Sequence, residues 1–431
     1  MIENPFYEKT AIIGGIQMAE QPKKPHKNKK QVRTFRSVLR RETKRILNKI
    51  NAFRLPINDN LFQTIIKLTV TVAAVAAVAF VCISDADISP SGTVRGFKDK
   101  RVLSHASGQG YPAEINGSRS IDAETVSHGT AVLTDTAYTV YDVKGRELIS
   151  QTHYMASPAM KTADRYTLLF DRMGTAYTLK TLSGSVCSGE TDHAIVAGAV
   201  SRSGRFAFVT NYDTAHSYVH VFSKNGKSLH KWKSGSYHIS DISVSPSGHT
   251  VAMCGVTTEN GKLKSAIIIQ KVGGNANLRE YTFDDTLLVA VQFTGDGSVT
   301  AIGDDKAVRL RVNEEKTQVY SYAGRTLTAY DISDNGQLAL AFSPHSDGQN
   351  TSVAVINAAC EEIANVATDL TSPYMELTNS RINLISQSRF YSYNFSGKLM
   401  ASADIPADSQ SVLTSGGKVL IRGITTVSEA S

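Results

Sequence analysis

A short polar turn recurs along most of this 431-residue chain, and its regular spacing constrains the fold more than any other feature. Five copies end in glycine and are followed by an apolar run: Gly129, Gly204, Gly248, Gly297 and Gly336. Degenerate copies end at Arg165, Arg381 and Gly417, so successive turns lie 36, 39, 44, 49, 39, 45 and 36 residues apart. Glycine suits a tight hairpin because it adopts positive φ without steric cost. The spacing therefore predicts a series of similar units.

Each unit is predicted to contain four short β-strands. Apolar and polar residues alternate in runs such as 205–210, 218–222, 308–312 and 337–342, which is the pattern of half-buried strands. A second turn falls later in the unit, at Gly145, Gly226 and Gly397. Four strands at a period of about 40 residues are typical of a propeller blade. In this part of the chain only residues 357–370 also fit a helix.

The fold class that follows is all-β, a β-propeller with WD40-like repeats. Seven complete units run from residue 121 to residue 406, and residues 409–422 add only two strands. An open two-stranded edge would expose unpaired backbone, and residues 110–118 are able to pair there and close the ring. We therefore predict eight blades, with seven blades and a pair of β-sandwiches as alternatives. A strict WD40 signature is missing, since Trp232 is the only tryptophan.

All of the net positive charge lies at the N-terminal end. Residues 1–60 carry 14 Lys and Arg against 5 Asp and Glu, whereas the whole chain has a net charge of +7. A basic arm of this kind is typical of contact with nucleic acid or with an anionic membrane surface. Residues 1–33 are basic and interrupted by proline, so we expect a disordered arm.

Residues 61–83 are predicted to form a transmembrane helix that acts as a signal-anchor. The segment has one charge, Lys67, and about 20 apolar residues are enough to cross the hydrocarbon core. A lysine near the end of a span keeps its ammonium group at the headgroups. The Lys and Arg bias places the N-terminus in the cytoplasm and residues 84–431 outside the cell membrane. A buried core helix and a cleaved signal peptide are the alternatives.

Residues 34–55 have the pattern of an amphipathic helix that lies on the inner leaflet, with a solvated charged linker as the alternative. The residues expected to contact anionic lipid headgroups are Arg36, Arg40, Arg41, Lys44, Arg45 and Lys49. Nucleic acid is the less favoured partner because the adjacent span holds the arm at the membrane. Residues 84–106 are polar and turn-rich, which predicts a stalk before an extracytoplasmic propeller at residues 107–425.

Four motifs accompany this organisation: Gly108-Gln-Gly110-Tyr-Pro112, His153-Tyr154 followed by Pro158, Asp171-Arg-Met-Gly174 and Lys231-Trp-Lys-Ser234. Together with the basic arm and the single span, they resemble an uncharacterised family of membrane-anchored β-propeller proteins of Gram-positive bacteria. The resemblance covers roughly residues 60–425. It implies the architecture and no known activity. Asp171-Arg-Met-Gly174 departs from the Asp-x-Gly-Gly expected at that place.

Candidate ligand residues are few. His153 and Tyr154 follow a predicted outer strand and are expected to line the propeller funnel, unless the tyrosine packs between blades. His216 and His220 can share one face of a strand, but no third residue has metal-ligand spacing. Asp304-Asp305 follows a glycine, where a solvated turn is favoured over a cation loop. We therefore expect no metal and no cofactor.

Enzyme activity is the less favoured reading because the sequence has no Gly-x-Ser-x-Gly elbow and no Ser-x-x-Lys set. Cys187, Cys254 and Cys360 lack metal-ligand spacing, and the sequence does not decide whether two of them form a disulfide.

We predict a non-enzymatic binding or scaffold module for an envelope protein or glycan, since loops on rigid scaffolds usually carry recognition. The alternative is an extracytoplasmic hydrolase or lyase acting on cell-wall glycan. Two carboxylates, or a histidine with a shifted pKa, in the funnel would favour it.

Overall fold

The computed structural model describes Thr69, Asp99 and residues 101–430, apart from 213, 214, 275, 334, 345–349, 369, 372, 373 and 387. The chain divides into two units, Met1–Ser84 and Asp85–Ser431, and the strands given below all belong to the second. Within the described residues, no helix has the length and apolar character needed to span a membrane. The predicted segments 1–33, 34–55 and 61–83 lie outside the described residues, except for Thr69.

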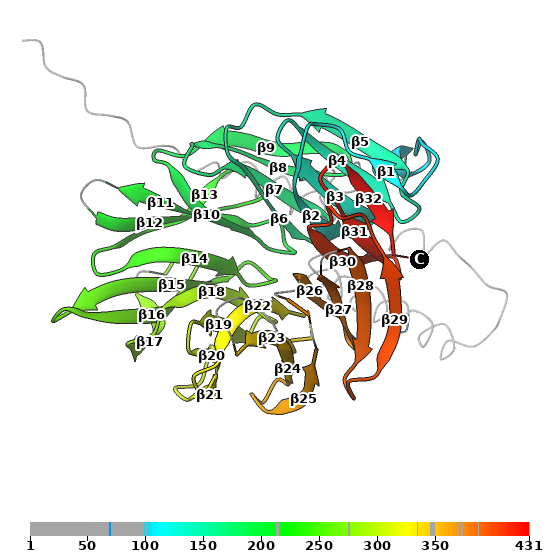
Figure 1. Cartoon of the computed structure of the whole chain (residues 1–431). Helices are drawn as coiled ribbons and strands as arrows, with labels where there is room; N and C mark the ends of the chain where they lie inside the picture. Colours follow the sequence, from blue (N-terminus) through cyan, green and yellow to red (C-terminus); the bar gives the residue numbers. More distant parts are fainter. Residues whose placement is uncertain are drawn as a thin grey trace, which may run out of the picture. The chain divides into compact units, whose positions relative to one another are not determined.

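The described residues form eight antiparallel sheets of four strands each, and each sheet is one blade of a ring (Figure 1). Blade 1 holds β2 (Ser120–Val126), β3 (Gly129–Thr134), β4 (Ala137–Asp142) and β5 (Glu147–Thr152). Blade 2 holds β6 (Pro158–Ala163), β7 (Tyr166–Asp171), β8 (Ala176–Thr181) and β9 (Gly184–Glu190). Blade 3 holds β10 (Ile195–Val200), β11 (Phe206–Tyr212), β12 (Ala215–Phe222) and β13 (Ser228–Ser234). Blade 4 holds β14 (His238–Val244), β15 (Thr250–Glu259), β16 (Lys262–Lys271) and β17 (Asn277–Asp284).

The next three blades follow the same order. Blade 5 holds β18 (Leu288–Phe293), β19 (Ser298–Gly303), β20 (Lys306–Arg311) and β21 (Thr317–Ser321). Blade 6 holds β22 (Thr326–Ile332), β23 (Leu338–Ser343), β24 (Ser352–Ile356) and β25 (Glu362–Ala367). Blade 7 holds β26 (Tyr374–Leu377), β27 (Arg381–Ser386), β28 (Arg389–Asn394) and β29 (Leu399–Asp404). Because β25 lies within residues 357–370 and no described residue of that segment is helical, the helical alternative is wrong.

Blade 8 closes the ring with strands from both ends of the repeat region. Its strand order is β1 (Ala113–Glu114), β32 (Thr426–Glu429), β31 (Lys418–Arg422) and β30 (Ser411–Ser415). In register, Ala113 lies opposite Val427 and Glu114 opposite Thr426. The prediction of eight blades, with the last one built from both ends of the repeat region, is therefore confirmed. Residues 113–114 do pair there, but their partner is β32 and not one of the two strands predicted within residues 409–422. The C-terminal side supplies three strands instead of two, because β32 lies beyond residue 425.

The first strand of each blade lies at the centre of the ring. First strands of neighbouring blades contact each other in the pairs β2/β6, β6/β10, β10/β14, β14/β18, β22/β26, β26/β30 and β30/β2. The chain then runs outward through each sheet and crosses back to the next first strand. The loops after the fourth strands and the turns between second and third strands consequently share one face, here called the upper face. The repeated polar turns lie between first and second strands, on the lower face.

Positive φ explains why glycine recurs in those lower turns. Gly204, Gly248 and Gly336 have φ of 79°, 73° and 80°, where an L-residue would be strained. At Gly204 and Gly248 a Cβ would also lie within 3.0 Å of a neighbouring side chain. Glycine is therefore needed in these turns both because φ is positive and because the neighbouring side chains leave no room for a Cβ atom.

Apolar side chains fill the space between adjacent blades. The cluster between blades 2 and 3 is aromatic, and its contacting ring centroids lie between 5.0 and 6.1 Å apart. The rings in these contacts belong to Phe170, Tyr177, Phe206, Phe208 and Phe222. Second strands such as β23 are buried along their whole length, since blades cover both of their faces. The core is thus a series of layers between blades.

Candidate functional site

The predicted ligand residues His153 and Tyr154 lie on the upper face, in the loop between β5 and β6. The two side chains have different environments. The Nε2 of His153 donates to the Thr134 carbonyl at 3.0 Å, and its Nδ1 accepts the Met155 N–H at 3.4 Å. Tyr154 is 99% exposed. His153 therefore holds the loop in place with both ring nitrogens, while Tyr154 projects into solvent.

Asp171 at the end of β7 fixes the other end of this loop. Its Oδ1 accepts the Ser157 N–H at 2.7 Å, and its Oδ2 accepts the Ala156 N–H at 3.2 Å. In the turn that follows, Met173 has φ of 64° and is 64% exposed. Methionine thus occupies a left-handed position where the resemblance led us to expect glycine. The result is a second exposed apolar side chain on the upper face.

A cavity of about 270 Å³ lies beside Tyr154, between blades 1 and 2. Strand register explains its lining. Tyr138 of β4 pairs with Gln151 of β5, so their side chains share the face that blade 1 turns toward blade 2. In blade 2, Leu169 of β7 pairs with Thr178 of β8, and these residues form the opposite wall. The remaining lining residues are Thr152, His153, Met155, Asp171, Ala176 and Lys180.

Lys180 is the cation of this cavity. Its Nζ donates to the Oε1 of Gln151 and lies 5.9 Å from the centroid of the Tyr138 ring. Burial lowers the pKa of Lys180 below its usual value. Among the described residues no carboxylate pairs with it, and the oxygens of Asp171 are occupied by backbone N–H groups. The lining therefore contains one ammonium group and one carboxylate, and the carboxylate is engaged by backbone N–H groups and not by Lys180.

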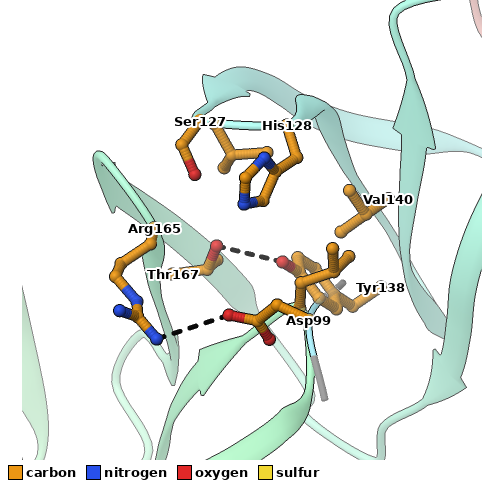
Figure 2. Close-up of a pocket in the computed structure, with 9 residues that line it drawn as sticks. Asp99, Ser127, His128, Tyr138, Val140, Arg165 and Thr167 are labelled. Carbon is orange, nitrogen blue, oxygen red and sulfur yellow. Dashed lines mark hydrogen bonds and ion pairs between the residues drawn. The ribbon is translucent and has the colours of Figure 1, made fainter. Parts of the chain in front are cut away.

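A second, much smaller cavity lies between the same two blades at the lower face (Figure 2). Its volume is about 10 Å³, which is room for one water-sized sphere. Asp99 pairs with Arg165 at 3.3 Å, and Tyr138 donates to the Oγ1 of Thr167 at 3.0 Å. Asp99 belongs to the predicted stalk, and it is 6% exposed. These contacts join the end of that segment to blade 2, and we assign this cavity to packing.

The centre of the ring contains a charged group that sequence analysis did not single out. Glu124 on β2, Lys161 on β6 and Asp241 on β14 belong to blades 1, 2 and 4, yet Lys161 interacts electrostatically with both acids. These first strands surround the centre of the ring, and the space between them is here called the central channel. Burial raises the pKa of Glu124 to about 7, with Lys161 acting in the opposite direction. Burial also raises the pKa values of Asp122 and Asp241.

Four acids on first strands, Glu124 and Asp241 among them, connect one blade to the next. In each case an acid on the first strand of one blade accepts a backbone N–H from the first strand of the following blade. The pairs are Glu124 with Thr162 at 2.7 Å, Asp241 with Val291 at 2.8 Å, Asp331 with Leu377 at 2.6 Å, and Glu376 with Thr414. Hydrogen bonds of this kind to a carboxylate are stronger than neutral ones. The acids therefore have a structural role around the channel.

The histidine pair does not form a metal site. His216 lies 4.4 Å from the ring of His238, and His220 is 2.8 Å from the Oγ of Ser228. In the part of the chain that the structure describes, no group of three His, Cys, Asp or Glu residues has the geometry to hold a metal ion. Cys187, Cys254 and Cys360 lie on separate blades and form no disulfide with one another, which answers the open question of a bond among these three described cysteines.

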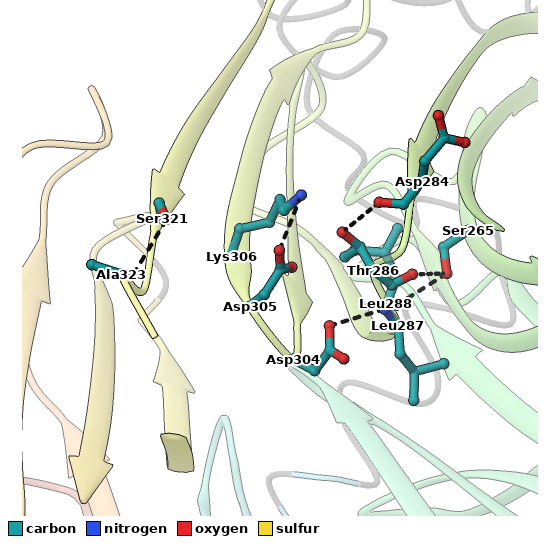
Figure 3. Close-up of polar contacts among 10 residues, drawn as sticks. All are labelled: Ser265, Asp284, Thr286, Leu287, Leu288, Asp304, Asp305, Lys306, Ser321 and Ala323. Carbon is teal, nitrogen blue, oxygen red and sulfur yellow. Dashed lines mark hydrogen bonds and ion pairs between the residues drawn. The ribbon is translucent and has the colours of Figure 1, made fainter. Parts of the chain in front are cut away.

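The Asp304-Asp305 turn has local partners (Figure 3). The Oδ1 of Asp304 accepts the Leu287 N–H at 2.9 Å, and Asp305 pairs with Lys306 at 3.2 Å. The turn thereby fixes the start of β18, in agreement with the favoured solvated-turn interpretation. The predicted lipid contacts Arg36, Arg40, Arg41, Lys44, Arg45 and Lys49 lie outside the described residues and stay predictions.

The closed ring and its loop-built cavity define the chain as an eight-bladed β-propeller. Residues 105–429 match the family described as "Family of unknown function (DUF5711)", and the chain belongs to this family. No curated protein matches the sequence. The predicted resemblance to an uncharacterised propeller family is confirmed to that extent. Membrane anchoring and Gram-positive origin are not tested by this match.

Two solved structures are similar in fold. One is BamB from Moraxella catarrhalis, with a TM-score of 0.51 and 12% identity over 74% of this chain and 97% of that chain. The other is the C-terminal WD40 domain of Sif2, with a TM-score of 0.52 and 9% identity over 75% of this chain and 99% of that chain. At such low identity these likenesses show the propeller architecture and its WD40-like character alone.

Proposed function

We propose that this protein is a membrane-anchored, extracytoplasmic binding module that presents its upper face to an envelope protein or glycan. The observation that carries the proposal is Tyr154, a fully exposed aromatic ring beside a ligand-sized cavity. Aromatic side chains are enriched where proteins bind partners, and among the large apolar side chains of the described residues Tyr154 is the most exposed. The loop that presents Tyr154 is fixed by His153 and Asp171, so the position of residue 154 on the upper face is set before a partner arrives.

Membrane anchoring belongs to the same proposal. It is supported by the sequence of residues 61–83, whose one charge is Lys67, and by the basic residues before it. In this arrangement residues 34–55 contact anionic lipid on the cytoplasmic side. The propeller then faces the outside of a Gram-positive type of envelope, where protein and glycan partners are available.

Photo-crosslinking in intact cells tests the binding role. A crosslinking amino acid replaces Tyr154 in the full chain, and a matched control carries it at Leu399, which is 46% exposed on the outer strand of blade 7. We expect position 154 to give a defined adduct that position 399 does not give. Identical adduct patterns at the two positions, or no adduct at position 154, would overturn the proposal.

A second candidate function is a hydrolase or lyase that acts on cell-wall glycan. The specific observation in its favour is the raised pKa of Glu124, about 7, next to Asp122 on the same strand. A carboxyl group that is partly protonated near neutral pH can serve as a general acid. Glu124 and Asp241 already accept backbone N–H groups from the next blade, and for this reason the binding role is preferred. Release of soluble glycan by the full chain, abolished in Glu124→Gln, would reverse the preference.

A further inference from the structure

We propose that the cavity between blades 1 and 2 binds an acidic sugar, with the ligand carboxylate at Lys180 and the sugar ring against Tyr154. The inference rests on the proposed function and deepens it by naming the ligand class. The site is assembled from β4, β5, β7, β8 and the loop between β5 and β6.

The ammonium group of Lys180 favours a ligand that brings a negative charge to it. The Lys180 ammonium donates to the neutral amide of Gln151, and its further donors have no carboxylate partner among the described residues. Asp171 is the one carboxyl group in the lining, and its two oxygens accept backbone N–H groups and do not pair with Lys180. A ligand carboxylate would therefore meet a cation in partly desolvated surroundings, where charge-assisted hydrogen bonds are strong. A neutral ligand leaves the ammonium group without this partner.

The size and lining of the cavity select a small polyhydroxylated ring. Its volume of about 270 Å³ falls just below the usual range for small-molecule sites, so one sugar unit fits better than an extended chain. Thr152 and Thr178 supply hydroxyl groups, and Gln151 supplies an amide, around the lysine. These groups can exchange hydrogen bonds with several ligand hydroxyls at once.

Tyr154 completes the site at its mouth. The ring is 99% exposed and is bordered by the cavity, so one aromatic face is available to the apolar side of a sugar ring. A peptide with a free C-terminal carboxylate has the same anionic group but lacks the several hydroxyl groups of a sugar. The polar lining therefore favours the sugar, and the experiment below compares the two ligands.

Ligand titration of the full chain, in a detergent without a sugar headgroup, tests the inference. The probes are methyl β-glucuronide and methyl β-glucoside, which differ in one carboxylate, and N-acetyl-alanyl-alanine as the peptide. We expect the glucuronide to bind at least about tenfold more tightly than the glucoside, because a charged hydrogen bond is gained. Equal affinities, or tighter binding of the peptide than of the glucuronide, would overturn the assignment.

Variants locate the binding. Lys180→Gln should weaken glucuronide binding about tenfold and leave glucoside binding unchanged, whereas Lys180→Arg keeps the charge and should lose less. Tyr154→Ala should weaken both sugars. The control is Lys262→Gln, which removes an exposed charge from the hairpin between β15 and β16 and should change nothing. Thermal unfolding of each variant checks that it is folded.

The result separates this inference from the proposed function. If the glucuronide does not bind, or if Lys180→Gln binds it as tightly as the wild type, the acidic-sugar site is refuted. Crosslinking at position 154 would still report whether the upper face contacts a partner. If crosslinking fails as well, the binding role itself is refuted.

Discussion

Replacing Val427 by alanine tests whether the ring is closed by both ends of the repeat region. Val427 on β32 is fully buried, and it pairs with Ala113 of the N-terminal strand β1. Its cluster also contains Ile115 from the N-terminal side, Leu413 and Leu420 from blade 8, and Val132 and Tyr141 from blade 1. Losing two methyl groups removes about 1.6 kcal/mol of transfer free energy, and the residual cavity brings the total to about 2–3 kcal/mol.

The assay is thermal unfolding of the full chain followed by circular dichroism. For a domain of roughly 330 residues the entropy of unfolding is about 0.7 kcal/mol/K, so the expected fall in Tm is about 3–4 °C. The matched control is Val289→Ala, because Val289 on β18 is 44% exposed. Its effect should stay within about 0.5 kcal/mol, or less than about 1 °C. Equal shifts in the two variants would refute the closure of blade 8 by β1 and β32.

Two further predictions concern buried polar groups. The pKa of Glu124 is raised from 4.5 to about 7 in the folded protein, so its contribution to stability is complete below pH 4.5 and is lost as the pH rises through 7. Glu124→Gln lacks this loss, and its Tm should fall less than that of the wild type between pH 4.5 and 7.5; parallel curves would contradict the assignment. The hydroxyl of Tyr322 is buried with no partner among the described residues, whereas that of Tyr138 donates to Thr167. Tyr322→Phe should therefore leave the free energy of unfolding unchanged or raise it, whereas Tyr138→Phe should lower it by about 1 kcal/mol, both measured by denaturant unfolding. A larger loss in Tyr322→Phe than in Tyr138→Phe would contradict the hydrogen bonding described for these two hydroxyl groups.

The repeat architecture was predictable because local chemistry determines it. A turn with positive φ needs glycine or a tolerant residue, and Gly204, Gly248 and Gly336 mark such turns at blade spacing. The short strand β32 was missed for a physical reason. Its sequence, Thr-Val-Ser-Glu, has four residues, and so short an alternation is a weak signal without its partners β31 and β1.

The site was predictable only in part. His153 and Tyr154 stood out as a motif, but their separate roles depend on the Thr134 carbonyl, which the sequence does not place beside His153. Lys180 gave no signal, since an isolated lysine in a strand usually faces solvent. Its environment arises when two blades meet. The environment of Glu124 was equally unpredictable. Glu124 and Asp122 are two residues apart and so lie on one face of β2, but this spacing does not show that the face is turned toward the centre of the ring.

Thiol labelling of Tyr154→Cys in intact cells tests the central claim of an exposed, outward-facing binding surface most directly. The residue is 99% exposed, whereas the native Cys254 is fully buried and serves as the unreactive reference. Labelling of the unmodified full chain provides the background from the other native thiols. We predict that a membrane-impermeant maleimide labels position 154 to the same extent in intact and in lysed cells. Labelling only after lysis, or no labelling under either condition, would contradict the account.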